Sequence, residues 1–152
     1  MSFVHPIVMV VFFYLLFMQK NAGLKIVSLK PHAPDFKDER KKLLDSHRSM
    51  AYLILGIGFV GMIGGALVTT YWLGYQVPFQ LTYGHPFFGL LILAALIIGV
   101  ILGFTIKDVK KPKIKERFLN FHYNIIYVVG AFAILSLLTG LIVLVNGPSP
   151  VS

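Results

Sequence analysis

The chain lacks cysteine, and this absence removes several kinds of chemistry at once. Its 152 residues contain no Cys, which excludes disulfide frameworks, thiol redox chemistry and cysteine-ligated clusters. Charged residues are also scarce, since Asp, Glu, Lys and Arg make up only 13% of the chain against 57% hydrophobic residues. Together with a mean hydropathy of +0.78, this composition excludes an ordinary soluble globular domain.

The apolar residues gather in long runs that lack the alternation typical of barrel strands. The four runs cover residues 3–18, 50–73, 86–106 and 118–145. Each approaches or exceeds the roughly 20 apolar residues that a membrane-spanning helix needs. The first run has no basic segment before it and no small-residue cleavage site after it, so we interpret it as a retained helix rather than a signal peptide.

The runs predict an all-α integral membrane protein, a single four-helix bundle made of two pseudo-repeated helix pairs. The expected helices cover about residues 3–23, 47–73, 85–106 and 118–145. Within the long loop before the second of these, Asp35 is a candidate N-cap, and Phe36, Leu43 and Leu44 recur at helical spacing. We therefore expect a surface helix that leads into the second membrane helix.

The charge pattern predicts how the helices are oriented. All 14 Lys and Arg residues and all six acids lie in residues 20–48 and 107–117. Because cytoplasmic loops carry an excess of Lys and Arg, we expect both charged loops to be cytoplasmic and both termini to be periplasmic or lumenal, in a bacterial inner membrane or a thylakoid. The net charge of +8 is then mainly a topology signal that also favours anionic lipid or an acidic partner. Nothing in the sequence indicates nucleic acid.

Histidines mark the start of all four expected helices. Each half of the chain begins with a His-Pro dipeptide, at His5 and His85, and has a second histidine after a basic loop, at His47 and His122. Such a repeat predicts a pseudo-twofold axis along the membrane normal. The axis would bring His5 opposite His85 near the outer face and His47 opposite His122 near the inner face. Two opposed imidazoles are the axial ligands of a low-spin electron-transfer haem, so the sequence predicts two b-type haems.

Each of these histidines is followed by a glycine 18 residues later. The four glycines are Gly23, Gly65, Gly103 and Gly140. Eighteen residues are five turns at about 3.6 residues per turn and span roughly 27 Å, so each glycine shares a helix face with its histidine. We expect these glycines to make room for the haem held at the opposite end, although glycine also promotes close helix packing without any cofactor.

Other interpretations of the histidines stay open. A chlorophyll magnesium needs one axial ligand, so the chain is alternatively a chlorophyll-binding or accessory subunit of a photosynthetic complex, or a scaffold without cofactor. The absence of Asp and Glu from the apolar runs argues against proton transport and against a di-iron site. Arg48 and Arg117 are candidates to pair with the propionates of the inner haem, but plain positive-inside charges explain them equally well. His32, between two prolines, is expected to be solvated.

The histidine pattern resembles that of the cytochrome b561 family and its four-helix relatives. There, two bis-histidine haems lie between the first and third and between the second and fourth helices. His5 with His85, and His47 with His122, match this arrangement over essentially the whole chain. The resemblance implies transmembrane electron transfer with a quinone, ascorbate or an electron-transfer protein as redox partner, alone or within a larger membrane complex. No ascorbate-binding signature is found, so the resemblance implies no particular substrate and no defined enzymatic activity.

Overall fold

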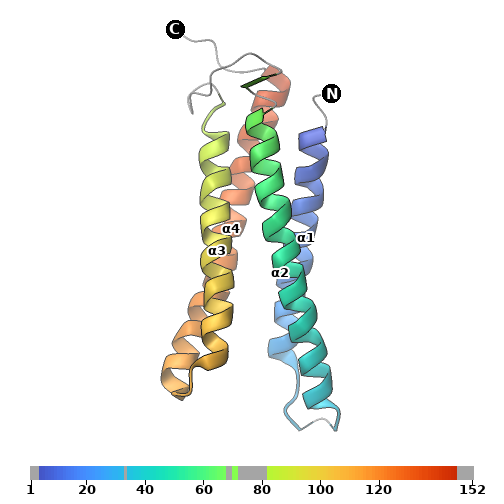
Figure 1. Cartoon of the computed structure of the whole chain (residues 1–152), viewed down its shortest axis with the longest axis vertical. Coiled ribbons are helices and arrows are strands. Elements are labelled where there is room, and N and C mark those ends of the chain that lie inside the picture. Colours follow the sequence, from blue (N-terminus) through green and yellow to red (C-terminus); the bar gives the residue numbers. More distant parts are fainter. Residues whose placement is uncertain (1–3, 33, 68–69, 72–81, 147–152) are drawn as a thin grey trace. The chain divides into compact units, whose positions relative to one another are not determined.

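The computed structural model describes residues 4–32, 34–67, 70–71 and 82–146. These residues form four long helices and no strand (Figure 1). The helices are α1 (Val4–Ser28), α2 (Phe36–Leu67), α3 (His85–Asp108) and α4 (Pro112–Asn146). Each is long and apolar enough to cross a membrane. The predicted fold class, an all-α membrane protein of four helices, is confirmed.

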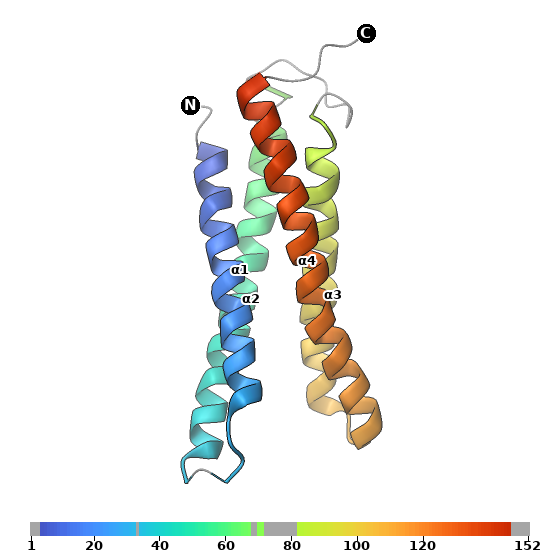
Figure 2. The same ribbon diagram turned by 180° about the vertical axis from the view of Figure 1, so that it is seen from behind.

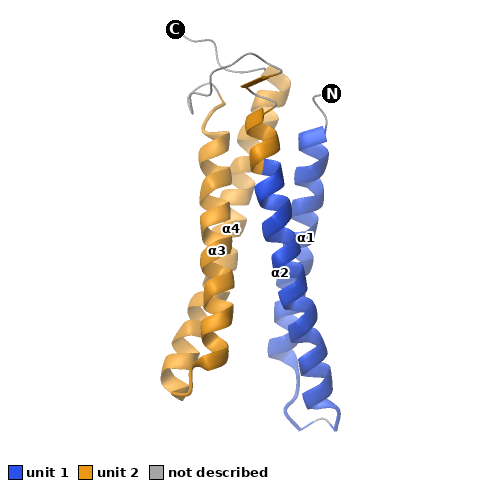
Figure 3. Ribbon diagram, in the orientation of Figure 1, with its two compact units in different colours: residues 1–61 blue, residues 62–152 orange. Residues whose placement is uncertain are grey.

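The chain divides into two compact units. Unit 1 is Met1–Gly61, with α1 and most of α2, and unit 2 is Met62–Ser152, with the end of α2 and all of α3 and α4 (Figure 3). Within unit 1, α1 and α2 lie side by side in both views, and the same holds for α3 and α4 within unit 2 (Figures 1 and 2). The partners in each pair are consecutive helices that run in opposite directions.

The helices extend beyond the apolar runs into the charged segments. α2 has 32 residues and begins at Phe36, so it is about 48 Å long at roughly 1.5 Å per residue and exceeds the membrane core. The carbonyl of Asp35 accepts a hydrogen bond from the N–H of Glu39 at 3.0 Å, which closes the first turn. The expected surface helix and the second membrane helix are therefore one continuous helix. Of the residues expected at its end, 68–69 and 72–73 lie outside the described residues.

A tight turn fixes where α3 begins. Tyr83 and Gly84 both have positive φ, at 53° and 77°, and the N–H of His85 donates to the carbonyl of Thr82 at 2.9 Å. Pro86 follows in the first helical turn, where its missing N–H costs little. A positive φ is unfavourable for tyrosine but suits glycine. This turn makes His85 the first residue of the helix.

Few side chains are fully buried in this chain. Phe12 and Ile54 in unit 1, and Val129 and Ser136 in unit 2, are each only 1% exposed, whereas many large apolar side chains along all four helices are exposed. An exposed apolar surface of this extent is unfavourable in water but matches a hydrocarbon solvent. Of these four buried side chains, only that of Ser136 is polar. Its surroundings are the first part of the candidate site.

Candidate functional site

His85 packs against α4 within unit 2. Its Nδ1 lies 2.8 Å from the backbone carbonyl oxygen of Ser136 and 3.4 Å from the Oγ of the same residue. One turn further along α4 is Gly140, where an added Cβ would lie 2.9 Å from the Cε1 of His85. The imidazole therefore occupies space that any other residue at position 140 would fill. We call this arrangement a glycine notch. In it, a histidine ring lies over a glycine of the neighbouring helix and also contacts the residue four positions before that glycine.

A second glycine notch is formed between the same two helices at their other ends. The Nδ1 of His122, on α4, lies 2.9 Å from the carbonyl oxygen of Gly99 on α3. A Cβ added to Gly103, four residues after Gly99, would lie 3.6 Å from the Cε1 of His122. The roles of α3 and α4 are exchanged and the contacts are of the same kind, but this ring lies less tightly over its glycine than that of His85 does.

The two carbonyl bonds determine which ring nitrogen carries the proton. A backbone carbonyl oxygen can only accept a hydrogen bond, so the Nδ1 of His85 and that of His122 must each be the donor. In a neutral imidazole the lone pair then lies on Nε2. Histidines that bind a metal through Nε2 typically donate their other N–H to a carbonyl or carboxylate, which orients the ring and raises its basicity. Both histidines of unit 2 therefore have the support and tautomer of Nε2 metal ligands.

These two imidazoles lie at different levels along the helix pair. His122 is beside Gly103, and Gly103 is 18 residues from His85 on α3. At about 1.5 Å per residue the two rings are separated by roughly 27 Å along the helix axis. This separation is close to the thickness of a membrane core, about 30 Å. The geometry of unit 2 agrees with one histidine near each membrane face.

Unit 1 contains a related arrangement around His47 on α2. A Cβ added to Gly23, on α1, would lie 3.5 Å from the Cε1 of His47. Four residues before this glycine is Gln19, whose Nε2 lies 3.0 Å from the backbone oxygen of His47 and 3.3 Å from its Nε2. Here the polar partner is a side-chain amide instead of a backbone carbonyl, and it contacts Nε2 instead of Nδ1.

The remaining predicted pairs cross from one unit to the other. His5 is a half-buried residue in the first turn of α1, and Gly65 lies near the end of α2. The pairing of His5 with His85 and of His47 with His122 joins residues of different units and stays a prediction. The interpretation of the glycines as space for a haem also stays a prediction, while three of them contact an imidazole of the neighbouring helix.

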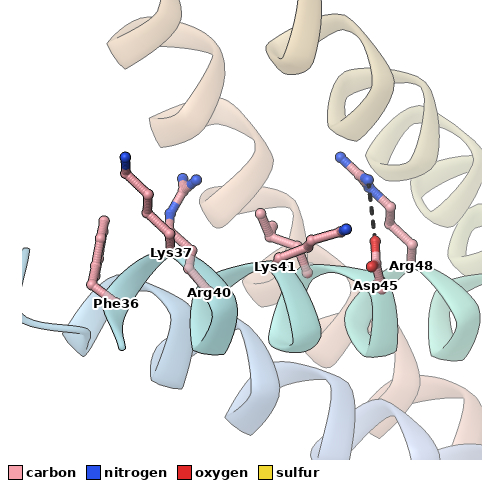
Figure 4. A pocket seen from close by; sticks show the side chains of 7 residues that line it. Phe36, Lys37, Arg40, Lys41, Asp45 and Arg48 are labelled. Atoms are coloured by element: carbon pink, nitrogen blue, oxygen red, sulfur yellow. Dashed lines mark ion pairs between the residues drawn. The ribbon is translucent and has the colours of Figure 1, made fainter. Parts of the chain in front are cut away.

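The predicted arginines lie at the charged end of each helix pair. Arg48 forms an ion pair with Asp45 at 3.7 Å, with side chains 42% and 60% exposed, and solvent weakens such a pair (Figure 4). Both belong to a shallow basic pocket along the start of α2, lined by Phe36, Lys37, Arg40, Lys41, Leu44, Asp45 and Arg48. Arg117 is exposed on α4, and His32 is exposed in its loop. Pairing of the arginines with propionates stays a prediction.

Sequence reasoning missed the residues that contact the histidine rings. They are Gln19, Gly99 and Ser136, and each precedes one of the predicted glycines by four residues. Residues four apart share a helix face, so the signal was a small or polar residue one turn before each glycine. Gly61 precedes Gly65 in the same way, and a Cβ added there would lie 3.0 Å from the Sδ of Met9.

Two further findings bear on what the site can hold. Among the described residues, no group of three or more His, Cys, Asp or Glu side chains gathers as a metal site would require. A bis-histidine haem site uses only two protein ligands, so the absence of larger groups among the described residues does not test it. No family model, curated protein or solved structure matches the chain. The resemblance to cytochrome b561 proteins therefore depends on the histidine pattern alone.

Proposed function

We propose that this chain is a di-haem b-type cytochrome that carries electrons across a membrane. The observation that carries the proposal is the repeated support of His85 and His122. Each ring donates from Nδ1 to a backbone carbonyl of the neighbouring helix, at 2.8 Å and 2.9 Å. Each also lies over a glycine. Such support keeps the lone pair on Nε2, so this nitrogen is the one available to a metal.

The donor set also fits haem chemistry. The candidate ligands are His5 and His85 for an outer haem and His47 and His122 for an inner haem, with Arg48 and Arg117 as partners for inner propionates. A bound b-type haem with two imidazole ligands supplies reversible one-electron chemistry. The chain holds and orients the imidazoles, and its long apolar helices exclude water. The separation of roughly 27 Å between the two histidine levels of unit 2 would place one haem near each membrane face.

The expected partners are membrane lipid and a redox carrier. The chain lies in an anionic-lipid membrane with its charged loops on the cytoplasmic or stromal side, as the positive-inside rule indicates. Its redox partner is a quinone or an electron-transfer protein, alone or as part of a larger membrane complex. The basic start of α2, with Lys37, Arg40 and Lys41 beside one pocket, favours an acidic protein surface on that side.

The experiment is a haem assay on the purified full chain. A pyridine haemochrome measurement should give two haems per chain, and the reduced-minus-oxidised spectrum should contain a sharp b-type α-band. His85→Ala and His122→Ala should each remove one haem and retain the other. His32→Ala is the matched control, because this histidine is exposed in a loop, and it should retain both. A magnesium pigment without haem, or a colourless folded protein, would overturn the proposal.

A further inference from the structure

The geometry points to Gln19 as a residue that covers the ligating nitrogen of His47 and thereby limits loading of the inner site. This inference rests on the proposed function, because it concerns how one of the four histidine ligands becomes available. It also predicts a difference between the inner and outer sites that the repeat of the sequence alone does not predict.

The orientation of the Gln19 amide follows from its neighbours. The amide nitrogen lies 3.0 Å from the backbone oxygen of His47, and that oxygen can only accept, so the –NH₂ group and not the amide oxygen must face it. The second hydrogen of the same –NH₂ group is directed to the Nε2 of His47, 3.3 Å away. Because a donor faces it, Nε2 is the acceptor and carries the lone pair.

This contact selects the ligating tautomer and occupies the ligand atom at once. At His85 and His122 the hydrogen bond from the neighbouring helix is made at Nδ1, on the opposite side of the ring from the bond to a metal. At His47 the bond from α1 is made at Nε2 itself. A lone pair cannot serve a metal and an N–H donor together, so iron binding at His47 requires the amide of Gln19 to leave.

The side-chain amide of Gln19 is held weakly enough to move away from the Nε2 of His47. The Oε1 of Gln19 is buried and has no hydrogen-bond partner among the described residues. A buried unsatisfied acceptor is unfavourable, and its cost offsets part of the two bonds that the –NH₂ group makes. The flanking Gly23 contributes no side chain, so the space beside the His47 ring is not blocked from that position. Gln19 therefore acts as a displaceable cover.

The test compares haem binding by full-length variants in which only the inner site is measured. His85→Ala removes an outer ligand, and in this background Gln19→Leu replaces the amide with an apolar side chain of similar size. The expected result is tighter and faster haem binding by about three- to tenfold, the effect of releasing one net hydrogen bond. Asn21→Leu, an exposed polar-to-apolar change on the same helix, is the control and should bind haem as the parent does.

Each outcome separates the inference from the proposed function. Equal binding by the Gln19→Leu and parent proteins, or loss of inner haem in the variant, would overturn the cover while leaving the di-haem proposal intact. Absence of haem binding in every protein, including the unmodified chain, would overturn the proposed function itself. Gln19→Asn, whose side chain is one methylene shorter and cannot reach Nε2 in the same way, gives the same test if the leucine variant does not fold. Its haem affinity should rise as well.

Discussion

Replacing Gly140 with alanine tests whether the glycine notch holds the imidazole of His85. The new Cβ would lie 2.9 Å from Cε1, 3.1 Å from Nδ1 and 3.7 Å from Nε2 of that ring. The first distance is shorter than real Cβ contacts show, and the second is tight enough that the ring would have to move by a few tenths of an ångström. The ring cannot retreat without stretching the 2.8 Å bond to the carbonyl of Ser136, so the substitution should break that bond or move α4.

The magnitude follows from three contributions. Overpacking typically costs about 1–3 kcal/mol, and loss of a net hydrogen bond costs about 1 kcal/mol. The higher helix propensity of alanine offsets this by roughly 1 kcal/mol. The free energy of unfolding should therefore fall by about 1–3 kcal/mol. Gly103→Ala is the matched control, because its Cβ would lie at an ordinary 3.6 Å from the ring of His122, and it should be neutral or slightly stabilising.

The assay is unfolding of both variants and the unmodified chain in detergent, together with their haem content. Gly140→Ala should unfold more easily and bind less haem at the outer site, and Gly103→Ala should do neither. Equal stabilities for the two variants would refute the idea that the 2.9 Å and 3.6 Å separations report how closely each ring is packed.

Two further changes should have small effects, for different reasons. In Gly61→Ala the new Cβ would lie 3.0 Å from the Sδ of Met9, but a flexible thioether can move, so the free energy of unfolding should fall by less than about 1 kcal/mol. A larger fall in the free energy of unfolding, measured in detergent, would show that neither the Met9 side chain nor the two helices α1 and α2 can move to accommodate the new Cβ. Asp45→Asn removes an ion pair whose side chains are 42% and 60% exposed, so the unfolding free energy should change by less than about 0.5 kcal/mol, and still less at high salt. A clear drop in haem content would contradict a purely superficial role for this pair.

Hydropathy predicted the existence of the helices better than their ends. The four runs mark where lipid solvates the chain, but a helix does not end where the apolar residues end. Lys, Arg and Glu are good helix formers, so α2 begins at Phe36 and α4 at Pro112, well before the apolar runs. The acidic residues Asp38 and Glu39 lie in the first turn of α2, where the helix dipole favours negative charge.

The candidate site was predictable only for side chains that carry recognisable chemistry. Ionisable residues are rare in apolar helices, so the spacing of the histidines could be noticed, and the glycines were found by their common offset from the histidines. The carbonyls of Gly99 and Ser136 could not be predicted from composition, because every residue has a carbonyl and only the packing of two helices selects which one faces a ring. Gln19 was missed for a related reason, since it directly follows the apolar run 3–18, where a polar residue is usually an interfacial side chain.

The offset of 18 residues has a packing explanation that is independent of any cofactor. His85 and Gly103 are 18 apart on α3, and His122 and Gly140 are 18 apart on α4. In an antiparallel pair, one register brings His85 to Gly140. The same register brings His122 to Gly103 only if the two offsets are equal. Both contacts are present. A shift of one residue in either helix would misalign both notches and rotate the histidine away from its glycine by about 100°.

The equal offsets therefore couple the two ends of the α3 and α4 pair. Each notch orients one imidazole, and the common register fixes the distance between them at roughly 27 Å. A histidine used only as a helix cap would need no such coupling, because a cap depends on its own helix alone. A pair of ligands that must lie at two fixed depths of a membrane does need it. This coupling of depth, ring orientation and tautomer in one register is what the proposed haem ligation would require, and packing of the two helices alone also accounts for it.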